Sequence, residues 1–343
     1  MRRTIDLDPA ARAAYDAIID VRSPSEFALD HVPGAINLPV LDDAQRAEVG
    51  TEFVQGSKFL ARRLGAAMVG RNIAAHLDGP LAGRTGAFRP LVYCWRGGQR
   101  SHAMATVMDQ VGWPVTLLEG GYQTWRRRVV ARLYDEAAPA PRLILLDGPT
   151  GSGKTAILHR LAGHDVQTLD LEGIAAHRGS LFGATGDSQP SQKLFETRLA
   201  DALDQLDLSR PVVVEAESSR IGGVALPPLV WSAMKTAPRV EIAAPLEARV
   251  AHILDEYSGM AAEAVDAALS RLPRHHGRAV IARWREMARD ADRAPLVREL
   301  IEQHYDPAYR RASAAPAAVV AVAGDLEAAA ADVAAIVPRF SLD

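Results

Sequence analysis

The stretch LILLDGPTGSGKTAIL, residues 143–158, constrains the fold of this 343-residue chain more than any other feature. Its glycines and lysine follow the pattern G-x4-G-K-T, placed directly after an apolar run and directly before a helical one, as a phosphate-binding loop requires. In such a loop, backbone N–H groups cradle a phosphate chain and the lysine neutralises its terminal groups. The pattern does not say which phosphate compound binds. The expected phosphate-binding residues are Gly148, Gly151, Ser152, Gly153, Lys154 and Thr155.

A magnesium ion at this loop would need a carboxylate in addition to the hydroxyl of Thr155. Glu215 ends the apolar run PVVVE, where a Walker-B carboxylate would stand, although aspartate is commoner at that place. Asp170 and Glu172, in TLDLEG, are rival carboxylates. We therefore expect Thr155 and Glu215 as the Mg²⁺ ligands, and we expect no tightly bound cofactor.

The only cysteine of the chain, Cys94, lies in PLVYCWRGGQRS, residues 90–101. An apolar strand that ends at Cys94, a glycine-containing loop and the helical pattern SHAMATVMDQVG place the thiol at a helix N-terminus. There the backbone N–H groups and the positive charges of neighbouring arginines favour the thiolate. The sequence therefore predicts a catalytic Cys94. Its anion-binding loop would consist of Arg96, Gly97, Gly98, Gln99 and Arg100.

The spacing from Cys94 to Arg100 is C-x5-R, which leaves a second chemistry open. The same spacing occurs in phosphatases whose cysteine loop cradles a phosphate. Tyr93 precedes the cysteine where those phosphatases usually have histidine. A loop of this width also suits a donor that is itself a phosphate derivative.

The order of apolar and helical patterns predicts two α/β domains with parallel sheets. The non-periodic segment EAAPAPR, residues 136–142, reads as a linker between a first domain at 1–135 and a second at 143–343. Strand-like runs alternate with helical patterns on both sides of it. Residues of about 246–314 are helical and charged, and they read as an insert in the second domain.

Composition excludes several classes of protein. The chain is 48% hydrophobic and has a net charge of −3, so its overall charge does not attract nucleic acid. It has no apolar run of about 18 residues, so no membrane partner is expected. The opening MRRTIDLDPA is basic but lacks the apolar region of a secretory signal. A single cysteine cannot form an internal disulfide, and we expect a cytoplasmic protein.

Three stretches of the first domain resemble rhodaneses, which carry sulfur or a related chalcogen on a loop cysteine. They are DVRSPSEFALDHVPGAINLP, YCWRGGQRS and LEGGYQTW, and rhodaneses usually have one residue fewer in the cysteine loop. The resemblance implies a rhodanese-like fold with Cys94 as its reactive residue. It also implies a framework role for five residues of the first stretch, and packing behind the active loop for three of the last. These residues are Asp20, Arg22, His31, Pro33 and Gly34, and then Gly120, Gly121 and Tyr122.

A rhodanese-like domain followed by a phosphate-binding loop resembles the bacterial tRNA 2-selenouridine synthases. Further stretches that carry this resemblance are QRAEVGTEF, LDLEGIAAHRGSLFG, VEAESSRIG and HYDPAY. It implies a tRNA substrate with 2-thiouridine at the wobble position. That sulfur would be geranylated from geranyl diphosphate, and selenium from selenophosphate would then replace the S-geranyl group. It further implies handover of selenophosphate from the enzyme that makes it.

Three sites that this chemistry needs are only weakly indicated by sequence. Arg274 and Arg278, in the helical insert, are the expected contacts to tRNA phosphates, with Arg126–Arg128 next in line. Trp95 is either a platform for a flipped base or a core residue. The apolar stretch 221–234, IGGVALPPLVWSAM, is either a pocket for the geranyl tail or core. His304, Tyr305 and Tyr309 have no evident chemical role.

Two further readings of the whole chain remain open. One is a C-x5-R phosphatase fused to a kinase-like phosphate-loop domain, which would release phosphate from phosphoesters without RNA. The other is a non-catalytic nucleotide switch that binds partners through an inert rhodanese-like domain, in which Cys94 would be dispensable.

Overall fold

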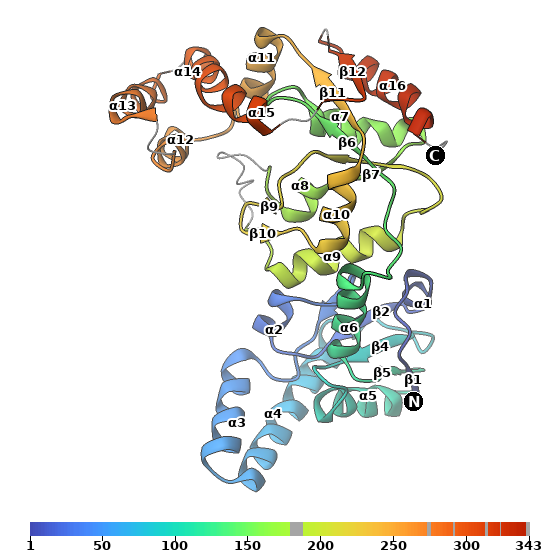
Figure 1. Cartoon of the computed structure of the whole chain (residues 1–343). Coiled ribbons are helices and arrows are strands. Elements are labelled where there is room, and N and C mark those ends of the chain that lie inside the picture. Colours follow the sequence, from blue (N-terminus) through green and yellow to red (C-terminus); the bar gives the residue numbers. More distant parts are fainter. Residues whose placement is uncertain (179–187, 273–275, 291, 313–314, 323, 341–343) are drawn as a thin grey trace. The chain divides into compact units, whose positions relative to one another are not determined.

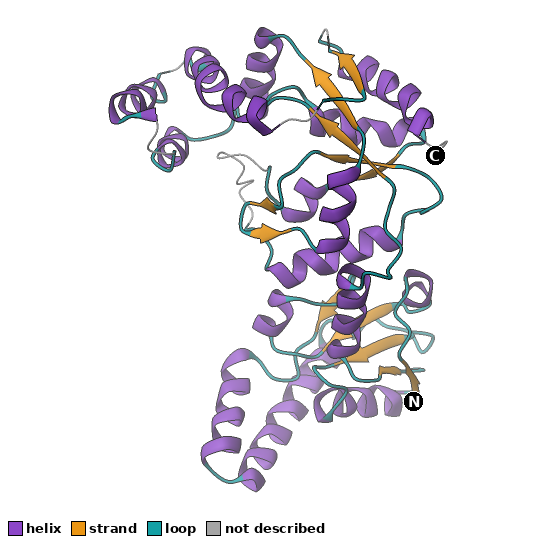
Figure 2. Ribbon diagram, viewed as in Figure 1, coloured by secondary structure: helices purple, strands orange, loops and turns teal. Residues whose placement is uncertain are grey.

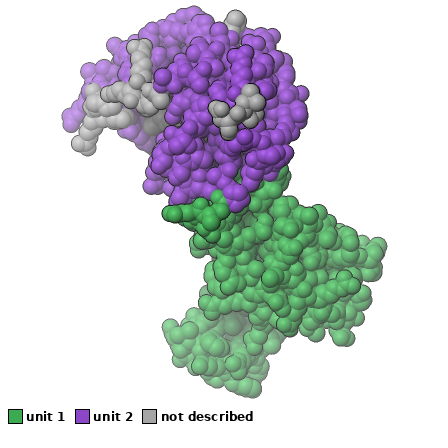
Figure 3. Space-filling model, turned by 45° about the vertical axis from the view of Figure 1, so that its right-hand side comes forward, with its two compact units in different colours: residues 1–138, 190–205 green, residues 139–189, 206–343 purple. Residues whose placement is uncertain are grey.

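The computed structural model describes residues 1–178, 188–272, 276–290, 292–312, 315–322 and 324–340. The chain forms two compact units, coloured separately in Figure 3. Unit 1 comprises Met1–Ala138 and Pro190–Gln205, and unit 2 comprises Pro139–Gln189 and Leu206–Asp343. Among the described residues, no helix is both long enough and apolar enough to cross a bilayer.

Unit 1 is built on a parallel sheet of five strands in the order β1-β5-β4-β2-β3. The strands are β1 (Arg2–Thr4), β2 (Ala17–Asp20), β3 (Ala35–Asn37), β4 (Pro90–Tyr93) and β5 (Thr116–Leu118). The register pairs Ile19 of β2 with Val92 of β4, both fully buried. Apolar residues of helices α4 (Lys58–Asp78) and α5 (Gln99–Val111), among them Ile73 and Met104, complete the core around these two strands.

Helices connect and cover these strands (Figure 1). In chain order they are α1 (Pro9–Ala13), α2 (Pro24–Leu29), α3 (Asp43–Gln55), α4 (Lys58–Asp78), α5 (Gln99–Val111) and α6 (Tyr122–Tyr134). Helix α2 begins with a capping box, in which Ser23 and Glu26 satisfy each other's backbone N–H groups. Glu26 is thereby fixed at the start of α2, close to the cysteine loop.

Helix α9 (Gln192–Asp204) belongs to unit 1, although the sequence-based boundaries place it in the second domain. It packs against α6 through buried polar contacts: Trp125 Nε1 donates to Thr197 Oγ1 at 3.1 Å. Arg128 pairs with Asp204 at 2.7 Å. The reason for the difference is that these partners lie about 70 residues apart in the chain, with no local pattern that links them.

Unit 2 is built on a second parallel sheet, in the order β12-β11-β6-β8-β7. Its strands are β6 (Leu143–Asp147), β7 (Gln167–Leu169), β8 (Val212–Glu215), β11 (Arg239–Ala243) and β12 (Ala318–Ala321). A separate antiparallel pair consists of β9 (Arg220–Ile221) and β10 (Val224–Ala225). Strand β6 lies in the centre and is buried at every residue, as expected for a parallel strand covered on both faces.

The helices of unit 2 fall into two groups (Figure 2). Those that alternate with strands are α7 (Lys154–Leu161), η1 (Ala162–His164), α8 (Leu171–Ala175), α10 (Pro228–Thr236), α16 (Leu326–Ile336) and η4 (Val337–Phe340). The helical insert contains α11 (Leu246–Glu256), α12 (Ala262–Leu269), α13 (Arg278–Met287), α14 (Ala294–Leu300), the π-helix η3 (Ile301–Tyr305) and α15 (Asp306–Ala312). The insert has its own small core around Trp284, Leu269 and Leu300. Two parallel α/β units with a helical insert were predicted, and they are confirmed.

Candidate active site

The cysteine loop connects β4 to α5. Cys94 follows the strand directly and is 3% exposed. Its Sγ accepts a hydrogen bond from the backbone N–H of Gly98 and lies close to the hydroxyl of Ser101, both at 3.2 Å. A thiol at the start of α5, with a backbone N–H aimed at it, is the arrangement that the sequence predicted for a reactive cysteine.

Glycines close this loop from behind. A side chain on Gly121, whose φ is +59°, would overlap the carbonyl oxygen of Cys94 and lie 2.6 Å from the N atom of Gly97. Gly97 has φ +68°, and a Cβ there would lie 3.1 Å from the N atom of Gly120. The loop backbone therefore approaches the turn before α6 more closely than any side chain would allow. The predicted packing role of Gly120 and Gly121 is consistent with these contacts.

Two arginines, Arg96 and Arg100, were predicted to stand near the thiol. Arg96 and Gln99 are exposed, as is Gly98. Arg100 instead pairs with Glu26 of α2, with Nη1–Oε2 and Nη2–Oε1 distances of 2.5 and 3.2 Å. Burial alone would raise the pKa of Glu26, but the hydrogen bond and charge of Arg100 outweigh it and lower that pKa. Sequence reasoning missed Glu26, because its partner lies 74 residues away.

Beneath the loop, Arg22 is almost fully buried and organises the framework. It binds Asp20 through Nε and Nη2, at 3.0 and 2.6 Å, and donates to the carbonyl of Asp30 at 2.6 Å. Its guanidinium lies 4.1 Å from the centre of the Tyr122 ring. A buried charge that is fully paired in this way fits the structural role predicted for Asp20 and Arg22.

Beside the cysteine, a cavity of about 560 Å³ opens along α6 and α9. Trp95 lines it and lies against Tyr122, with ring centres 5.1 Å apart. Arg127 and Lys193 supply positive charge at the same cavity. Trp95 is partly exposed and is therefore not a core residue, which was one of its two readings. Of the Arg126–Arg128 cluster, Arg126 pairs with Glu196 and Arg128 with Asp204.

The phosphate-binding loop connects β6 to α7, as its pattern predicted. Gly148, Gly151 and Gly153 all have positive φ, at +148°, +82° and +80°. Lys154 Nζ turns back and donates to the carbonyl of Gly148 at 2.7 Å. Burial lowers the pKa of Lys154, against the opposing effect of nearby carboxylates. The hydroxyl of Ser152 is buried, and no partner for it lies among the described residues. Among the described residues, the Ser152 hydroxyl has no partner and the hydrogen bond of Lys154 goes to its own loop, which suits a site that receives an anion.

Carboxylates gather next to this loop. Thr155 donates to Glu172 Oε2 at 3.0 Å. Burial, followed by the negative charge of Glu217, raises the pKa of Glu172 to about 8. Burial also raises the pKa of Glu215, whose Oε2 accepts from the N–H of Leu171 at 3.1 Å. The partner of the Thr155 hydroxyl is thus Glu172, the rival carboxylate, and not Glu215.

The residues present fit a magnesium ion of the kind that shares its coordination with phosphate. Such an ion needs only one or two carboxylates and a hydroxyl, because substrate oxygens and water complete its shell. Thr155 and Glu172 provide that pair, while the second oxygen of Glu215 has no partner among the described residues. Glu217, two residues after Glu215, was missed by sequence reasoning, although it continues the same run VEAE.

The helical insert holds the phosphate-binding loop in place through Arg249 of α11. Arg249 Nε donates to the carbonyl of Thr150 at 2.8 Å, and its two other nitrogens bind Asp306 of α15 at 3.1 and 2.6 Å. Asp306 is the aspartate of the HYDPAY stretch, so part of that stretch acts through Arg249. In the same stretch, Nδ1 of His304 lies 2.9 Å from Nε2 of His276.

The remaining predicted residues have mixed outcomes. Arg278 is exposed at the start of α13, and Arg274 lies outside the described residues. The stretch 221–234 is not a pocket: Ile221, Val230 and Met234 are at most 2% exposed and form part of the core. That reading as a geranyl pocket was wrong, because the antiparallel pair β9–β10 and helix α10 bury these side chains against unit 2.

Comparison with known proteins gives matches over both units. Residues 7–128 match the family described as rhodanese-like domain, and residues 141–277 match the tRNA 2-selenouridine synthase AAA domain. The tRNA 2-selenouridine synthase of Nitrosomonas europaea is 38% identical over 70% of this chain and 63% of its own length. That of Chromohalobacter salexigens is 37% identical over 70% and 64%.

The protein of the same name from Cupriavidus pinatubonensis is 36% identical over 73% of this chain and 68% of its own length. The chain thus matches about two thirds of the length of these relatives. The rhodanese-like match covers the cysteine loop of the first sheet, and the AAA-domain match covers the phosphate-binding loop of the second. This chain belongs to the tRNA 2-selenouridine synthase family.

Proposed function

We propose that this protein converts 2-thiouridine at the wobble position of tRNA into 2-selenouridine, in two half-reactions. The observation that carries the proposal is that one chain of this family contains both a cysteine loop and a phosphate-binding loop, each between a parallel strand and a helix. Each half-reaction uses a phosphorus-containing donor, geranyl diphosphate in the first and selenophosphate in the second. We assign the first donor to the phosphate-binding loop and the second to the cysteine loop.

In the first half-reaction, the sulfur of the base attacks the allylic carbon of geranyl diphosphate. The carbon–oxygen bond breaks, the diphosphate leaves with the electron pair, and the base loses its N3 proton. Lys154 and the loop N–H groups stabilise the leaving anion, because its charge grows in the transition state. The Ser152 hydroxyl would donate to the same anion. Mg²⁺ held by Thr155 and Glu172 would neutralise further charge on the diphosphate.

In the second half-reaction, the selenium of selenophosphate attacks C2 of the S-geranyl base, and geranylthiol leaves. The phosphoryl group that remains on selenium then passes to Cys94 Sγ: a P–S bond forms as the P–Se bond breaks, and the electron pair stays on the selenium of the base. N3 regains a proton, and water cleaves the P–S bond to release phosphate. The C-x5-R spacing and the Gly98 N–H at Sγ support this role for Cys94.

The cavity at Trp95 suits an unpaired base beside Cys94. A flipped base can stack on Trp95, and Arg127 and Lys193 line the same cavity, where they can contact backbone phosphates. Arg278 offers a further exposed cation for tRNA phosphates. We infer that selenophosphate arrives from the enzyme that makes it, and that the reaction takes place in the cytoplasm.

The test is to separate the half-reactions by mutation. Purified protein is mixed with a 2-thiouridine tRNA, geranyl diphosphate, selenophosphate and Mg²⁺, and the nucleosides are analysed by mass spectrometry. Lys154→Ala should leave 2-thiouridine unchanged, because the diphosphate leaving group is no longer stabilised. Cys94→Ser should accumulate S-geranyl-2-thiouridine without forming 2-selenouridine. Lys235→Ala, which removes an exposed lysine of α10, is the matched control and should form the final product.

The alternatives give different outcomes in the same assay. Geranyl transfer by Lys154→Ala at the wild-type rate would overturn the assignment of the phosphate-binding loop. Release of phosphate from phosphoesters without tRNA, lost in Cys94→Ser, would instead indicate the C-x5-R phosphatase. A wild-type protein that modifies no tRNA but changes partner affinity with nucleotide would indicate the switch.

A further inference from the structure

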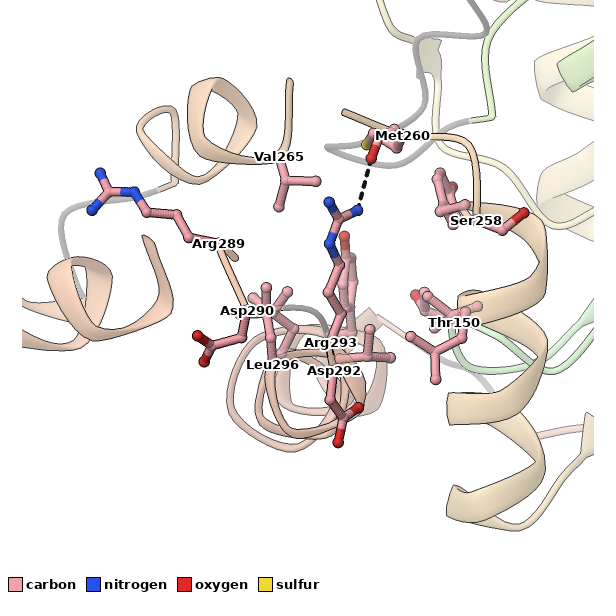
Figure 4. Close-up of a pocket in the computed structure, with 15 residues that line it drawn as sticks. Thr150, Ser258, Met260, Val265, Arg289, Asp290, Asp292, Arg293 and Leu296 are labelled. Carbon is pink, nitrogen blue, oxygen red and sulfur yellow. Dashed lines mark hydrogen bonds between the residues drawn. The ribbon is translucent and has the colours of Figure 1, made fainter. Parts of the chain in front are cut away.

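Unit 2 has a cavity of about 560 Å³ that none of the residues assigned above explains (Figure 4). Its walls come from three helices of the insert, which contribute Ile253 and Leu254 of α11, Val265 of α12, and Leu296 and Val297 of α14. Its remaining wall includes Thr150 of the phosphate-binding loop. A cavity of this volume is large enough for a small organic ligand.

The cavity adjoins the phosphate-binding loop. A Cβ on Gly151 would lie 2.8 Å from Ile253 Cδ1 and 2.9 Å from the carbonyl of Arg249, so the loop backbone touches α11 directly. Ile253 therefore both contacts the loop and lines the cavity. Arg249 fixes this junction through its hydrogen bond to Thr150. A ligand with phosphates on the loop therefore has this cavity next to it, since Thr150 of the loop lines the cavity.

The charged residues at the cavity do not make it an anion site. Arg289 and Asp290 are exposed and extend away from Thr150, and Asp292 is also exposed (Figure 4). Arg293 points across the cavity, but its guanidinium donates to the carbonyl of Met260 at 2.7 Å. The walls are apolar, and the charged side chains at the cavity either point outward or bind the backbone. This arrangement favours an apolar ligand.

Some of the apolar side chains that line the cavity are not fully covered, although Val265 and Leu296 are buried. Ile253, Leu254 and Val297 are each only partly buried, in contrast to the fully packed core residues of stretch 221–234. Partly exposed aliphatic groups in a concave site gain free energy when an apolar ligand removes them from water.

We propose that this cavity binds the hydrocarbon tail of the allylic diphosphate whose diphosphate group occupies the phosphate-binding loop. The inference rests on the proposed function for the loop and adds the place of the tail. The tail enters past Thr150 and Ile253 and lies against α11 and α14. The cavity thereby selects donors by chain length, because a short tail leaves part of the apolar wall in water.

The experiment measures binding to the full chain by calorimetry, with geranyl diphosphate, dimethylallyl diphosphate, inorganic diphosphate and ATP as probes. The wild type should bind geranyl diphosphate most tightly and inorganic diphosphate least tightly of the three diphosphates. Val297→Trp fills the cavity, and Leu254→Asp places a charge in its wall. Either variant should weaken the binding of geranyl diphosphate about tenfold or more, which corresponds to the loss of contact with roughly two methylene groups. The affinity for inorganic diphosphate should stay unchanged.

Val54→Trp, at an 81% exposed position of α3 in unit 1, is the matched control and should leave all four affinities unchanged. Retained binding of inorganic diphosphate shows that a variant has folded. If the wild type binds inorganic diphosphate and binds geranyl diphosphate no more tightly, the tail site is overturned while the loop assignment stands. If it binds no diphosphate, both are overturned. If Val297→Trp weakens ATP alone, the cavity holds a nucleoside and the proposal is wrong.

Discussion

The cysteine loop and the phosphate-binding loop have the same local architecture, a parallel strand, a glycine-rich turn and a helix, but they differ in how complete they are. In the cysteine loop the polar groups already have partners within the protein: Sγ accepts from the Gly98 N–H, and Arg100 pairs with Glu26. In the phosphate-binding loop, the one hydrogen-bond partner of Lys154 within the described part of the chain is the carbonyl of Gly148, and carboxylates with raised pKa lie nearby. The first is organised before any substrate arrives, and the second needs a ligand to satisfy its groups.

The two loops are also held differently. The cysteine loop is fixed by backbone contacts of glycines, as at Gly121. The phosphate-binding loop is held by a distant side chain as well as by close packing: Arg249, 99 residues along the chain from Thr150, donates to the Thr150 carbonyl, and Gly151 lies against Ile253 of α11. This comparison predicts which substitutions damage which loop.

The largest effect is expected for Arg249→Met, which leaves Asp306 without its partner and releases the Thr150 carbonyl. Breaking a buried ion pair costs about 3 kcal/mol of unfolding free energy, and diphosphate binding should weaken as well. Denaturant unfolding and calorimetry would measure both. The control, Arg285→Met, removes an exposed pair with Asp266 and should cost much less. Equal losses in the two variants would mean that Arg249 does not hold the loop.

The next largest effect is expected for Gly121→Ala, which tests the backbone packing of the cysteine loop. Overlap with the Cys94 carbonyl and the positive φ should cost about 2 kcal/mol, and the variant should lose selenium transfer but keep geranyl transfer. Gly34→Ala is the control, since its φ is also positive, at +76°, but its Cβ would meet nothing within 4 Å. It should cost only the conformational strain, about 1 kcal/mol. Similar behaviour of the two variants would contradict close packing at Gly121.

A smaller effect is expected for Glu26→Gln, which removes the charge that holds Arg100. The loss should be about 1 kcal/mol at neutral pH for this partly buried pair. Because the folded-state pKa of Glu26 is lowered, its contribution is present above the usual value of 4.5 and is lost as the pH falls through the folded-state pKa. The difference in unfolding free energy between wild type and variant should therefore shrink in acid. If the difference in unfolding free energy does not change with pH, the effect of Glu26→Gln comes from altered packing and not from the lost charge of Glu26.

The last prediction is a dependence of stability on pH; it concerns Glu172 and applies to the protein without ligand or metal. Its pKa rises from 4.5 to about 8 on folding, so the folded state prefers the protonated carboxyl. The contribution of Glu172 to the free energy of unfolding is greatest below pH 4.5, falls as the pH rises towards about 8, and is constant above that pH. Glu172→Gln should make this slope shallower, because Glu215 and Glu217, whose pKa values are also raised, still contribute to it, whereas the exposed Glu48→Gln should leave it unchanged. An identical slope in wild type and Glu172→Gln would show that the carboxyl is not held protonated.

What the sequence predicts well is what lies within a short stretch of chain. The strand–loop–helix contexts of Cys94 and Lys154 are local patterns, and both are confirmed as structural contexts. The two-residue strands β9 and β10 were missed, and so were β1 and β3, which have only three residues each. Segments of this length carry little periodicity of their own; β5 and β7 also have three residues each, but they lie within the longer strand-like runs PVTLLEGG and VQTLDL, which were predicted.

What the sequence could not predict are contacts between distant segments. Glu26 with Arg100, Arg249 with Asp306, and α9 with α6 each join residues at least 50 positions apart. The arginines illustrate the point: several that appeared free to bind phosphates are paired with carboxylates, as Arg126 is with Glu196. Charge patterns in a sequence show which groups are available, and folding decides which of them remain available.

Helix α9 has a consequence for how this protein could have arisen and how it can be taken apart. The chain passes from one unit to the other at residues 138–139, returns at 189–190 and leaves again at 205–206. Cutting within 136–142 would therefore strip the first unit of the helix that receives the Trp125 hydrogen bond, and would leave that helix attached to the second. Each unit is thus built from two separate segments of the chain. No single cut in the polypeptide can separate the two units intact.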